Sequence, residues 1–312
     1  MPVWIAIGAF VLGAVLAVWA TERLLEGLVS LATVLKLSAF VVGAVLSGLE
    51  AENIAVGLGA GANAAAPVAL GSVFGGAIFL VCVALGLGAV LFPLKVKLPR
   101  LILVIFALSP VLAGIGLIEP ITPRWAGLVL LLAFGGAMLY LIAASRHQNF
   151  LNNDEIAEAQ EKQHSLLGAV GLTVLGIVVI SVGGELVALG AENLIAGLGV
   201  PAFLMGMVVT PAAIELEEVV RQAIPAKEGR PDVSVGNLVG TLLYFILFNF
   251  GLVALITPVE VNPLVRNLDW PFLIAVTWLA TFFLWRGRVD RGAGALLLGA
   301  YAGYVVLHLI FR

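Results

Sequence analysis

Ten apolar runs of roughly 20 residues, the length that crosses a bilayer as a helix, occupy most of this chain. Only 11% of its 312 residues are charged, less than half of the roughly 25% found in soluble domains. Backbone groups in lipid must be hydrogen-bonded within the protein, so such runs fold as packed helices. The predicted fold class is all-α integral membrane, with ten transmembrane helices near residues 3–34, 37–61, 68–93, 100–118, 124–144, 165–197, 200–223, 234–257, 269–285 and 292–311.

The remaining composition excludes several classes of protein. The formal net charge is -3 and there is no basic block, which argues against nucleic acid as a partner. The single cysteine, Cys82, lies in an apolar run and provides neither a disulfide framework nor a cysteine metal site. The first apolar run is preceded by no Lys or Arg, which favours a membrane helix over a cleaved signal peptide. We expect no bound cofactor.

One extended polar segment, residues 146–164, separates five apolar runs from five others. It is predicted to be a cytoplasmic linker between a first five-helix repeat, residues 1–145, and a second, residues 165–312. A duplication is supported because an offset of 163 residues superimposes identical residues of the two halves, and further along an offset of 165 aligns Gly71 with Gly236. The pairs at the first offset are Glu22 with Glu185, Ala39 with Ala202, Phe40 with Phe203, Gly43 with Gly206 and Val45 with Val208.

The charges of alternate loops predict that the two halves have opposite orientations. With an odd number of helices in each half, the second half starts on the other side of the membrane. Most cations lie in the loops of one side, which the positive-inside rule makes cytoplasmic. Both termini are then expected outside, in what we take to be a prokaryotic cell membrane. The cytoplasmic set is Lys95, Lys97, Arg100, Arg146, Lys162, Arg221, Lys227, Arg230, Arg286, Arg288 and Arg291, and the outer set is Arg124, Arg266 and Arg312.

Each half also has carboxylates within an apolar run, and ionisable groups inside a membrane mark a functional site by default. A Gly48 or Pro211 about one turn earlier is expected to interrupt each helix and free backbone carbonyls. Carboxylates, hydroxyls and carbonyls together form an all-oxygen site, which hard cations such as Ca²⁺ prefer. The predicted ligands of one shared metal site are Ser47, Glu50, Glu52, Asn53, Thr210, Glu215, Glu217 and Glu218.

The spacing of the second cluster also allows a simpler local interpretation. Glu215 and Glu218 are three residues apart and are predicted to share a helix face, whereas Glu217 is predicted to point elsewhere. Arg221 follows within four residues, so a salt bridge at the cytoplasmic edge would satisfy one of the carboxylates.

Four segments resemble the α-repeats of a known family. Phe40-Val-Val-Gly43 and Phe203-Leu-Met-Gly206 match the opening of such a repeat, and Gly71-Ser-Val-Phe-Gly75 and Gly236-Asn237-Leu-Val-Gly240-Thr241 match its close. The chain thereby resembles the calcium/cation antiporter superfamily, which includes the sodium/calcium and proton/calcium exchangers. The resemblance implies ten helices in two inverted repeats and an ion-binding role for Glu218. In the first half the counterpart is either Asn53, or Ala55 with Glu52 displaced.

The chain also departs from that family. The family's Thr-Ser-x-Pro-Glu core is absent from both copies. Positions further along that are polar in the family are occupied here by Gly76, Ala77 and Leu80 in the first half, and by Thr241, Leu242 and Phe245 in the second. In the family those positions contribute to sodium sites, so sodium coupling is in doubt. The extra glutamates instead offer carboxylates whose pKa rises on burial, which makes proton exchange chemically reasonable.

We therefore expect an antiporter, not an enzyme, that exchanges a divalent cation, most simply Ca²⁺, for H⁺ or Na⁺ by alternating access. Its partners would be inorganic cations and the lipid bilayer. Two alternatives stay open. Glu217-Glu218-Val-Val-Arg221 resembles the paired-Glu motif of the CAAX-type intramembrane proteases, and the altered ion motifs also fit a transporter-like protein that does not transport.

Overall fold

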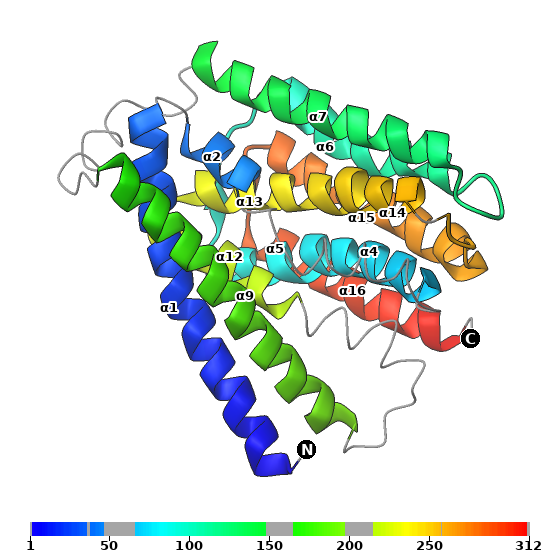
Figure 1. Cartoon of the computed structure of the whole chain (residues 1–312), viewed down its shortest axis with the longest axis horizontal. Coiled ribbons are helices and arrows are strands. Elements are labelled where there is room, and N and C mark those ends of the chain that lie inside the picture. Colours follow the sequence, from blue (N-terminus) through cyan, green and yellow to red (C-terminus); the bar gives the residue numbers. More distant parts are fainter. Residues whose placement is uncertain are drawn as a thin grey trace.

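The computed structural model describes residues 2–35, 38–46, 66–147, 165–196, 215–256 and 258–310, and these are almost entirely helical (Figure 1). Seven of the described helical segments are long and apolar enough to cross a membrane. The first half comprises α1 (Val3–Leu35), α2 (Ala39–Leu46), α4 (Ala66–Phe79), α5 (Leu85–Leu91), α6 (Arg100–Ala113) and α7 (Arg124–His147). The second comprises α9 (Leu166–Ala196), α12 (Leu216–Lys227), α13 (Pro231–Leu243), α14 (Phe250–Ile256), α15 (Trp270–Trp285) and α16 (Arg291–Ile310).

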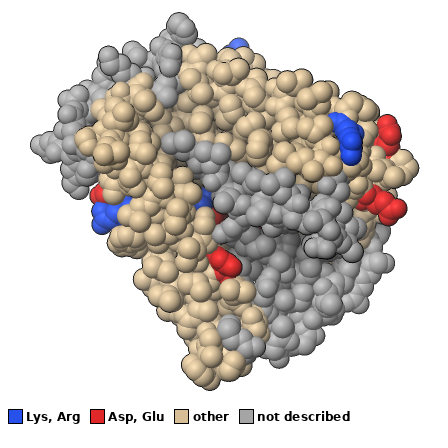
Figure 2. Space-filling model, in the orientation of Figure 1, with Lys and Arg blue, Asp and Glu red and all other residues tan. Residues whose placement is uncertain are grey.

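The all-α membrane fold predicted from the apolar runs is confirmed. Charged side chains are sparse on the described part of the face in Figure 2, as a surface in contact with lipid requires. Helix ends lie within a few residues of the predicted ones wherever both ends are described. The full set of ten helices stays a prediction, because parts of the runs 37–61 and 200–223 lie outside the described residues.

The two longest helices, α1 and α9, lie side by side and run in opposite directions (Figure 1). Glycines bring their backbones together, since a methyl group at Gly13 would overlap the backbone of Gly183 and Val187. Toward the other end of α1, Gly27 lies against Thr173 in the same way. Small residues at such crossings allow the close packing on which helix association in lipid depends.

Equivalent positions of α1 and α9 make equivalent contacts with the opposite helix. Gly176, which is Gly13 shifted by 163 residues, lies against Leu24, and Gly190, which is Gly27 shifted by 163, lies against Phe10. Adding the same 163 to Leu24 gives Val187, one of the residues that Gly13 contacts. The two helices therefore use equivalent positions reciprocally.

Short π-helical segments occur at matching places in the two halves. One, η1 (Leu80–Ala84), joins α4 to α5, and another, η5 (Tyr244–Asn249), joins α13 to α14. An offset of 165 residues places Leu80 within η5 at Phe245. These helices form the largest hydrophobic core, in which Phe74 of α4 meets Phe250 of α14 edge to face at 5.5 Å between ring centroids. Such π segments are rare and often lie at functional sites.

Two small antiparallel contacts join loops of the two halves. Strand β1 (Leu94–Lys95) pairs with β2 (Arg288–Val289), so two loops assigned to the same cation-rich side meet. Ile121 forms an isolated bridge with Glu260, in two loops assigned to the opposite side. Short turns, 3₁₀-helix η2 (Gly114–Gly116) and π-helix η6 (Val265–Asp269) complete the connections.

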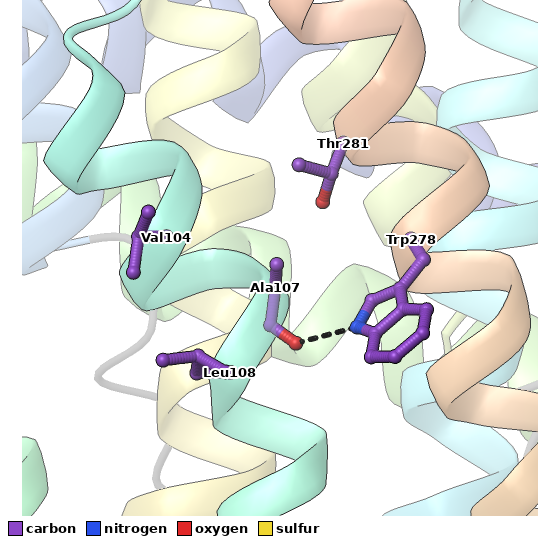
Figure 3. Close-up of a pocket in the computed structure, with 5 residues that line it drawn as sticks. All are labelled: Val104, Ala107, Leu108, Trp278 and Thr281. Carbon is purple, nitrogen blue, oxygen red and sulfur yellow. Dashed lines mark hydrogen bonds between the residues drawn. The ribbon is translucent and has the colours of Figure 1, made fainter.

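An apolar groove of about 310 Å³ opens on the surface between α6 and α15 (Figure 3). Its walls are Val104, Ala107 and Leu108 of α6 with Trp278 and Thr281 of α15. The indole Nε1 of Trp278 donates to the carbonyl oxygen of Ala107 at 3.0 Å. None of the described residues that line this groove is ionisable, so they offer no charged ligand for a cation.

Candidate functional site

Helix α12 differs from the other described helices because it is short and carries several ionisable groups into the protein interior. It packs against α1, α5, α9 and α13, and its residues Glu217, Glu218 and Arg221 are 6%, 0% and 3% exposed. Glu215, 4% exposed, immediately precedes the helix with non-helical dihedral angles. An ionised group buried to this degree is costly unless it is paired, so the partners of these carboxylates decide what the site can do.

One arginine connects two of the three carboxylates. Arg221 Nη2 lies 2.8 Å from Glu217 Oε1, and Arg221 Nη1 lies 2.8 Å from Glu218 Oε1. The i+4 and i+3 spacings along α12 bring all three side chains together. The local salt bridge foreseen for one glutamate is confirmed, and it includes both.

Three features of this arrangement correct the sequence-based predictions. Glu217 does not point away from Glu218, because both carboxylates converge on one guanidinium. Glu215 and Glu218 do not share a face of one helix, because α12 begins only at Leu216. Arg221, assigned to the cytoplasmic loops, is buried inside the protein instead.

Helix α13 supplies a second set of contacts to the site. Asn237 Nδ2 donates to the other oxygen of Glu218, Oε2, at 2.6 Å. Asn237 Nδ2 also lies 2.9 Å from the side-chain oxygen of Gln222, whose amide nitrogen donates to the carbonyl and hydroxyl oxygens of Ser234 at 2.9 and 2.8 Å. The Ser234 hydroxyl in turn donates to the backbone carbonyl of Gln222 at 2.9 Å. This network holds the carboxylate of Glu218 in one orientation.

The other two carboxylates face helices that belong to different parts of the chain. Glu215 Oε1 lies 3.4 Å from the position that a Cβ on Gly76 of α4 would take. Gly184 of α9 has no side chain and leaves room for the carboxylate of Glu217, with which any Cβ would overlap. The carboxylates of Glu215 and Glu217 therefore reach the first-half helix α4 and the second-half helix α9, respectively.

The predicted first-half ligands cannot be placed beside these groups. Ser47, Glu50, Glu52 and Asn53, together with Thr210, lie outside the described residues and stay predicted ligands. In the part of the chain that the structure describes, no three His, Cys, Asp or Glu side chains come together to hold a metal ion. A complete oxygen shell would therefore need groups beyond α12 and α13.

Sequence reasoning missed two sets of buried polar residues. Asn237 and Gln222 were not among the predicted ligands, although Asn237 was part of the Gly-Asn pattern that carried the family resemblance. A separate cluster joins α16 to the end of η6: Asp269 Oδ1 accepts from the Tyr304 hydroxyl at 3.0 Å and lies 2.8 Å from His308 Nε2. All three residues of this cluster are at most 1% exposed.

The sequence matches the model of a known protein family in both halves of the chain. The sequence profile described as sodium/calcium exchanger protein matches residues 5–143 and 168–310, one region in each half. The chain belongs to the sodium/calcium exchanger protein family. The helices that surround the Glu217–Arg221–Glu218 cluster, α1, α9, α12 and α13, lie within the matched regions except for the first two residues of α1 and of α9.

Individual relatives are distant, and two of them span most of the chain. Inner membrane protein YrbG of Escherichia coli is 24% identical over 273 residues, 83% of this chain and 82% of that protein. CaxA of Alkalimonas amylolytica, which is named as a proposed antiporter, is 26% identical over 314 residues, 95% and 96% of the two chains. Sodium/calcium exchanger MaX1 of Methanosarcina acetivorans is 25% identical over 111 residues, 35% of this chain and 32% of the exchanger.

The fold is that of a solved exchanger. The sodium-calcium exchanger NCX_Mj, in crystals soaked with 2.5 mM Na⁺ and 10 mM Sr²⁺, superimposes with a TM-score of 0.81 over 97% of this chain and 99% of its own. Sequence identity is 21%, so this likeness concerns the fold alone. Together these matches make the protein a membrane-embedded member of a family of cation exchangers.

Proposed function

We propose that this protein is a secondary antiporter that exchanges a divalent cation, most simply Ca²⁺, for H⁺ or Na⁺. The cation would bind near the bilayer midplane between Glu215, Glu217 and Glu218 of the second half and the predicted first-half ligands Glu50, Glu52 and Asn53. The hydroxyls of Ser47 and Thr210 or nearby carbonyls would complete the shell. Protons or sodium ions would compete for the same carboxylates, and that competition couples the two fluxes.

The observation that carries this proposal is the burial of Glu217 and Glu218 side by side in a chain of the exchanger family. Glu218 falls at the position that the family resemblance marks as ion-binding, and Asn237 of the next helix orients it. Carboxylate and amide oxygens are suitable ligands for hard cations. A buried carboxylate can also accept a proton, because loss of hydration favours its neutral form.

We also propose that the chain is built from two inverted five-helix repeats, residues 1–145 and 165–312, joined by a cytoplasmic linker, with both termini outside. The antiparallel pair α1 and α9, with its reciprocal glycine contacts, supports this arrangement. The bridges Leu94–Val289 and Ile121–Glu260 support the topology, since each joins loops assigned to one side of the membrane. Alternating access would then be a movement of one group of helices against another around the site.

Flux measurements in proteoliposomes test the function. Purified protein should move ⁴⁵Ca²⁺ against an imposed proton or sodium gradient, and Glu52→Gln combined with Glu218→Gln should abolish the flux. Glu119→Gln, at an exposed loop position, is the matched control and should transport normally. Thermal unfolding of each variant separates loss of transport from loss of the fold.

Two outcomes would overturn the proposal. If neither gradient drives Ca²⁺, and Mn²⁺ and K⁺ are inert as well, the protein is not the proposed antiporter. If the Glu52/Glu218 double variant transports normally, the assigned carboxylates are wrong. Specific cleavage of a lipidated peptide would favour the intramembrane protease instead, although His308 is engaged with Asp269 and Tyr304 in the structure.

A further inference from the structure

We propose that Arg221 is a tethered cation that competes with the transported ion for Glu217 and Glu218. This inference rests on the proposed antiport function and concerns how the same carboxylates discriminate between cations. In this conformation the guanidinium takes the place beside the carboxylates that a bound ion would need. Substrate binding would therefore be an exchange, in which the ion displaces a side chain that is already present.

The contacts of Arg221 support a specific counter-ion role. Its two terminal nitrogens each lie 2.8 Å from a different carboxylate, which is the short distance of charge-assisted hydrogen bonds. The three side chains are 3%, 5% and 0% exposed, so little water screens their attraction. A guanidinium stays protonated at any physiological pH, so this positive charge cannot be removed by titration.

The void that the described residues form beside the guanidinium is small. The void beside Arg221 has a volume of about 10 Å³ and is lined by Thr21 of α1 and Asn237 of α13, among apolar side chains. Such a volume is at the lower limit for one water molecule. Ca²⁺ needs six to eight oxygen atoms at roughly 2.3–2.6 Å. Because Oε1 of Glu217 and Oε1 of Glu218 already contact Arg221 at 2.8 Å, a Ca²⁺ ion that bound both oxygens would have to displace the guanidinium.

The charges of these three side chains lead to the same conclusion. Glu217, Glu218 and Arg221 sum to one negative charge, which one monovalent cation or proton would neutralise. Without Arg221 the same two carboxylates carry two negative charges, which match one divalent cation, and the buried Glu215 adds a further carboxylate to the proposed site. Displacement of Arg221 therefore raises the negative charge that the site offers to Ca²⁺, whereas a proton, which needs no cavity, can bind a carboxylate with Arg221 in place.

Removal of this charge should tighten Ca²⁺ binding. Arg221→Gln takes away the competitor and keeps a side chain that donates hydrogen bonds. The half-saturating Ca²⁺ concentration for ⁴⁵Ca²⁺ uptake should fall roughly tenfold or more, because a buried ion pair no longer has to be broken. The Ca²⁺-dependent rise in melting temperature of the purified protein should increase in parallel. Arg221→Lys should show a smaller fall, since an ammonium cannot bridge both carboxylates as a fork does.

Arg230→Gln provides the matched control. Arg230 also pairs with a nearby carboxylate, Asp232, at 3.2 Å, but it does not contact Glu217 or Glu218 in any described interaction. Its half-saturating Ca²⁺ concentration should equal that of the wild type.

The outcomes separate this inference from the proposed function. A folded Arg221→Gln protein that transports with unchanged or weakened Ca²⁺ affinity overturns the tethered-cation role and leaves the antiporter intact. If Arg221→Gln does not fold, Arg221→Lys decides, and an affinity equal to wild type overturns the inference. If neither wild type nor any variant responds to a cation, in flux or in melting temperature, the proposed function fails and this inference fails with it.

Discussion

A swap that puts an amide at position 218 and a carboxylate at position 237 would test the hydrogen bonds between Glu218, Arg221 and Asn237 while the shape of the site changes little. Glu218 Oε1 accepts from Arg221 at 2.8 Å, and Oε2 accepts from Asn237 at 2.6 Å. Glutamine at position 218 has the same size but only one acceptor. Its amide nitrogen must therefore face a donor, either the guanidinium of Arg221 or the amide of Asn237.

The expected cost of Glu218→Gln follows from these two contacts. A hydrogen bond to a charged group contributes about 1.5–3 kcal/mol, and a buried donor left without an acceptor costs about 1–3 kcal/mol. The variant should thus lose about 2–4 kcal/mol of unfolding free energy. This is less than the cost of leaving a lone buried charge, because Arg221 keeps its contact with Glu217. Asn237→Asp alone should also destabilise, because it places a second carboxylate against Glu218.

The double variant Glu218→Gln/Asn237→Asp should recover much of that loss. The new amide at position 218 can donate to the new carboxylate at 237 and still accept from Arg221. Gln222 need only reverse its side-chain amide to direct its nitrogen toward position 237. We expect a coupling free energy of about 2 kcal/mol or more between the two positions, measured as a double-mutant cycle by reversible unfolding in detergent.

Simple additivity would refute the reasoning. If the destabilisation of the double variant equals the sum of the two singles within about 0.5 kcal/mol, Glu218 and Asn237 do not interact as described. Thr241→Val, one turn further along α13, is the control. The Thr241 hydroxyl is buried with no hydrogen-bond partner among the described residues, so its replacement by a methyl group should leave stability nearly unchanged.

Three further perturbations test other parts of the fold. Asp269→Asn removes the charged partner of His308 and should cost about 1–3 kcal/mol of unfolding free energy; an unchanged value would mean that the pair is not formed. Gly176→Leu should separate α9 from α1 and lower the melting temperature by several degrees, whereas Gly171→Leu, with no atoms near its Cβ position, should be neutral. Asp290→Ala removes the acceptor for the N–H of Ala293 at the start of α16. That hydrogen bond, and then Arg288 and Arg286, hold the pKa of Asp290 below its usual range, so the stability difference from wild type should shrink as the pH falls through that lowered pKa; a pH-independent difference would contradict this.

The long membrane helices could be predicted from the sequence because hydropathy acts locally. Each of α1, α7, α9 and α16 corresponds to one of the predicted apolar runs, so its ends follow from where the run ends. Helix α12 was less predictable, because it is short and amphipathic, and the break expected near Pro211 did not fix the start of this helix at Leu216. The π segments η1 and η5 have no sequence signature, since they depend on packing between helices.

The candidate site could be located from the sequence, but its hydrogen bonds could not. The spacing within α12 allowed the Arg221 salt bridge to be foreseen, because partners three and four residues apart meet on any helix. The hydrogen bond between Asn237 and Glu218 depends on how α12 packs against α13, which a local sequence pattern does not determine. The same holds for Asp269 and His308, which lie on different helices and came together only in the folded chain.

The position of Glu215 explains how this chain departs from its family without losing the polarity of the region. The family resemblance predicts a polar side chain at the position of α4 that Gly76 occupies in this chain. The structure places a carboxylate oxygen of Glu215 beside that glycine, where any larger residue would approach both Glu215 and Phe245. The polar group at this point of the helix interface therefore comes from the second half and not from α4. Under the proposed antiport function, this carboxylate would serve as a site for a proton as well as for a cation, whereas a hydroxyl or an amide at position 76 would not accept a proton at neutral pH.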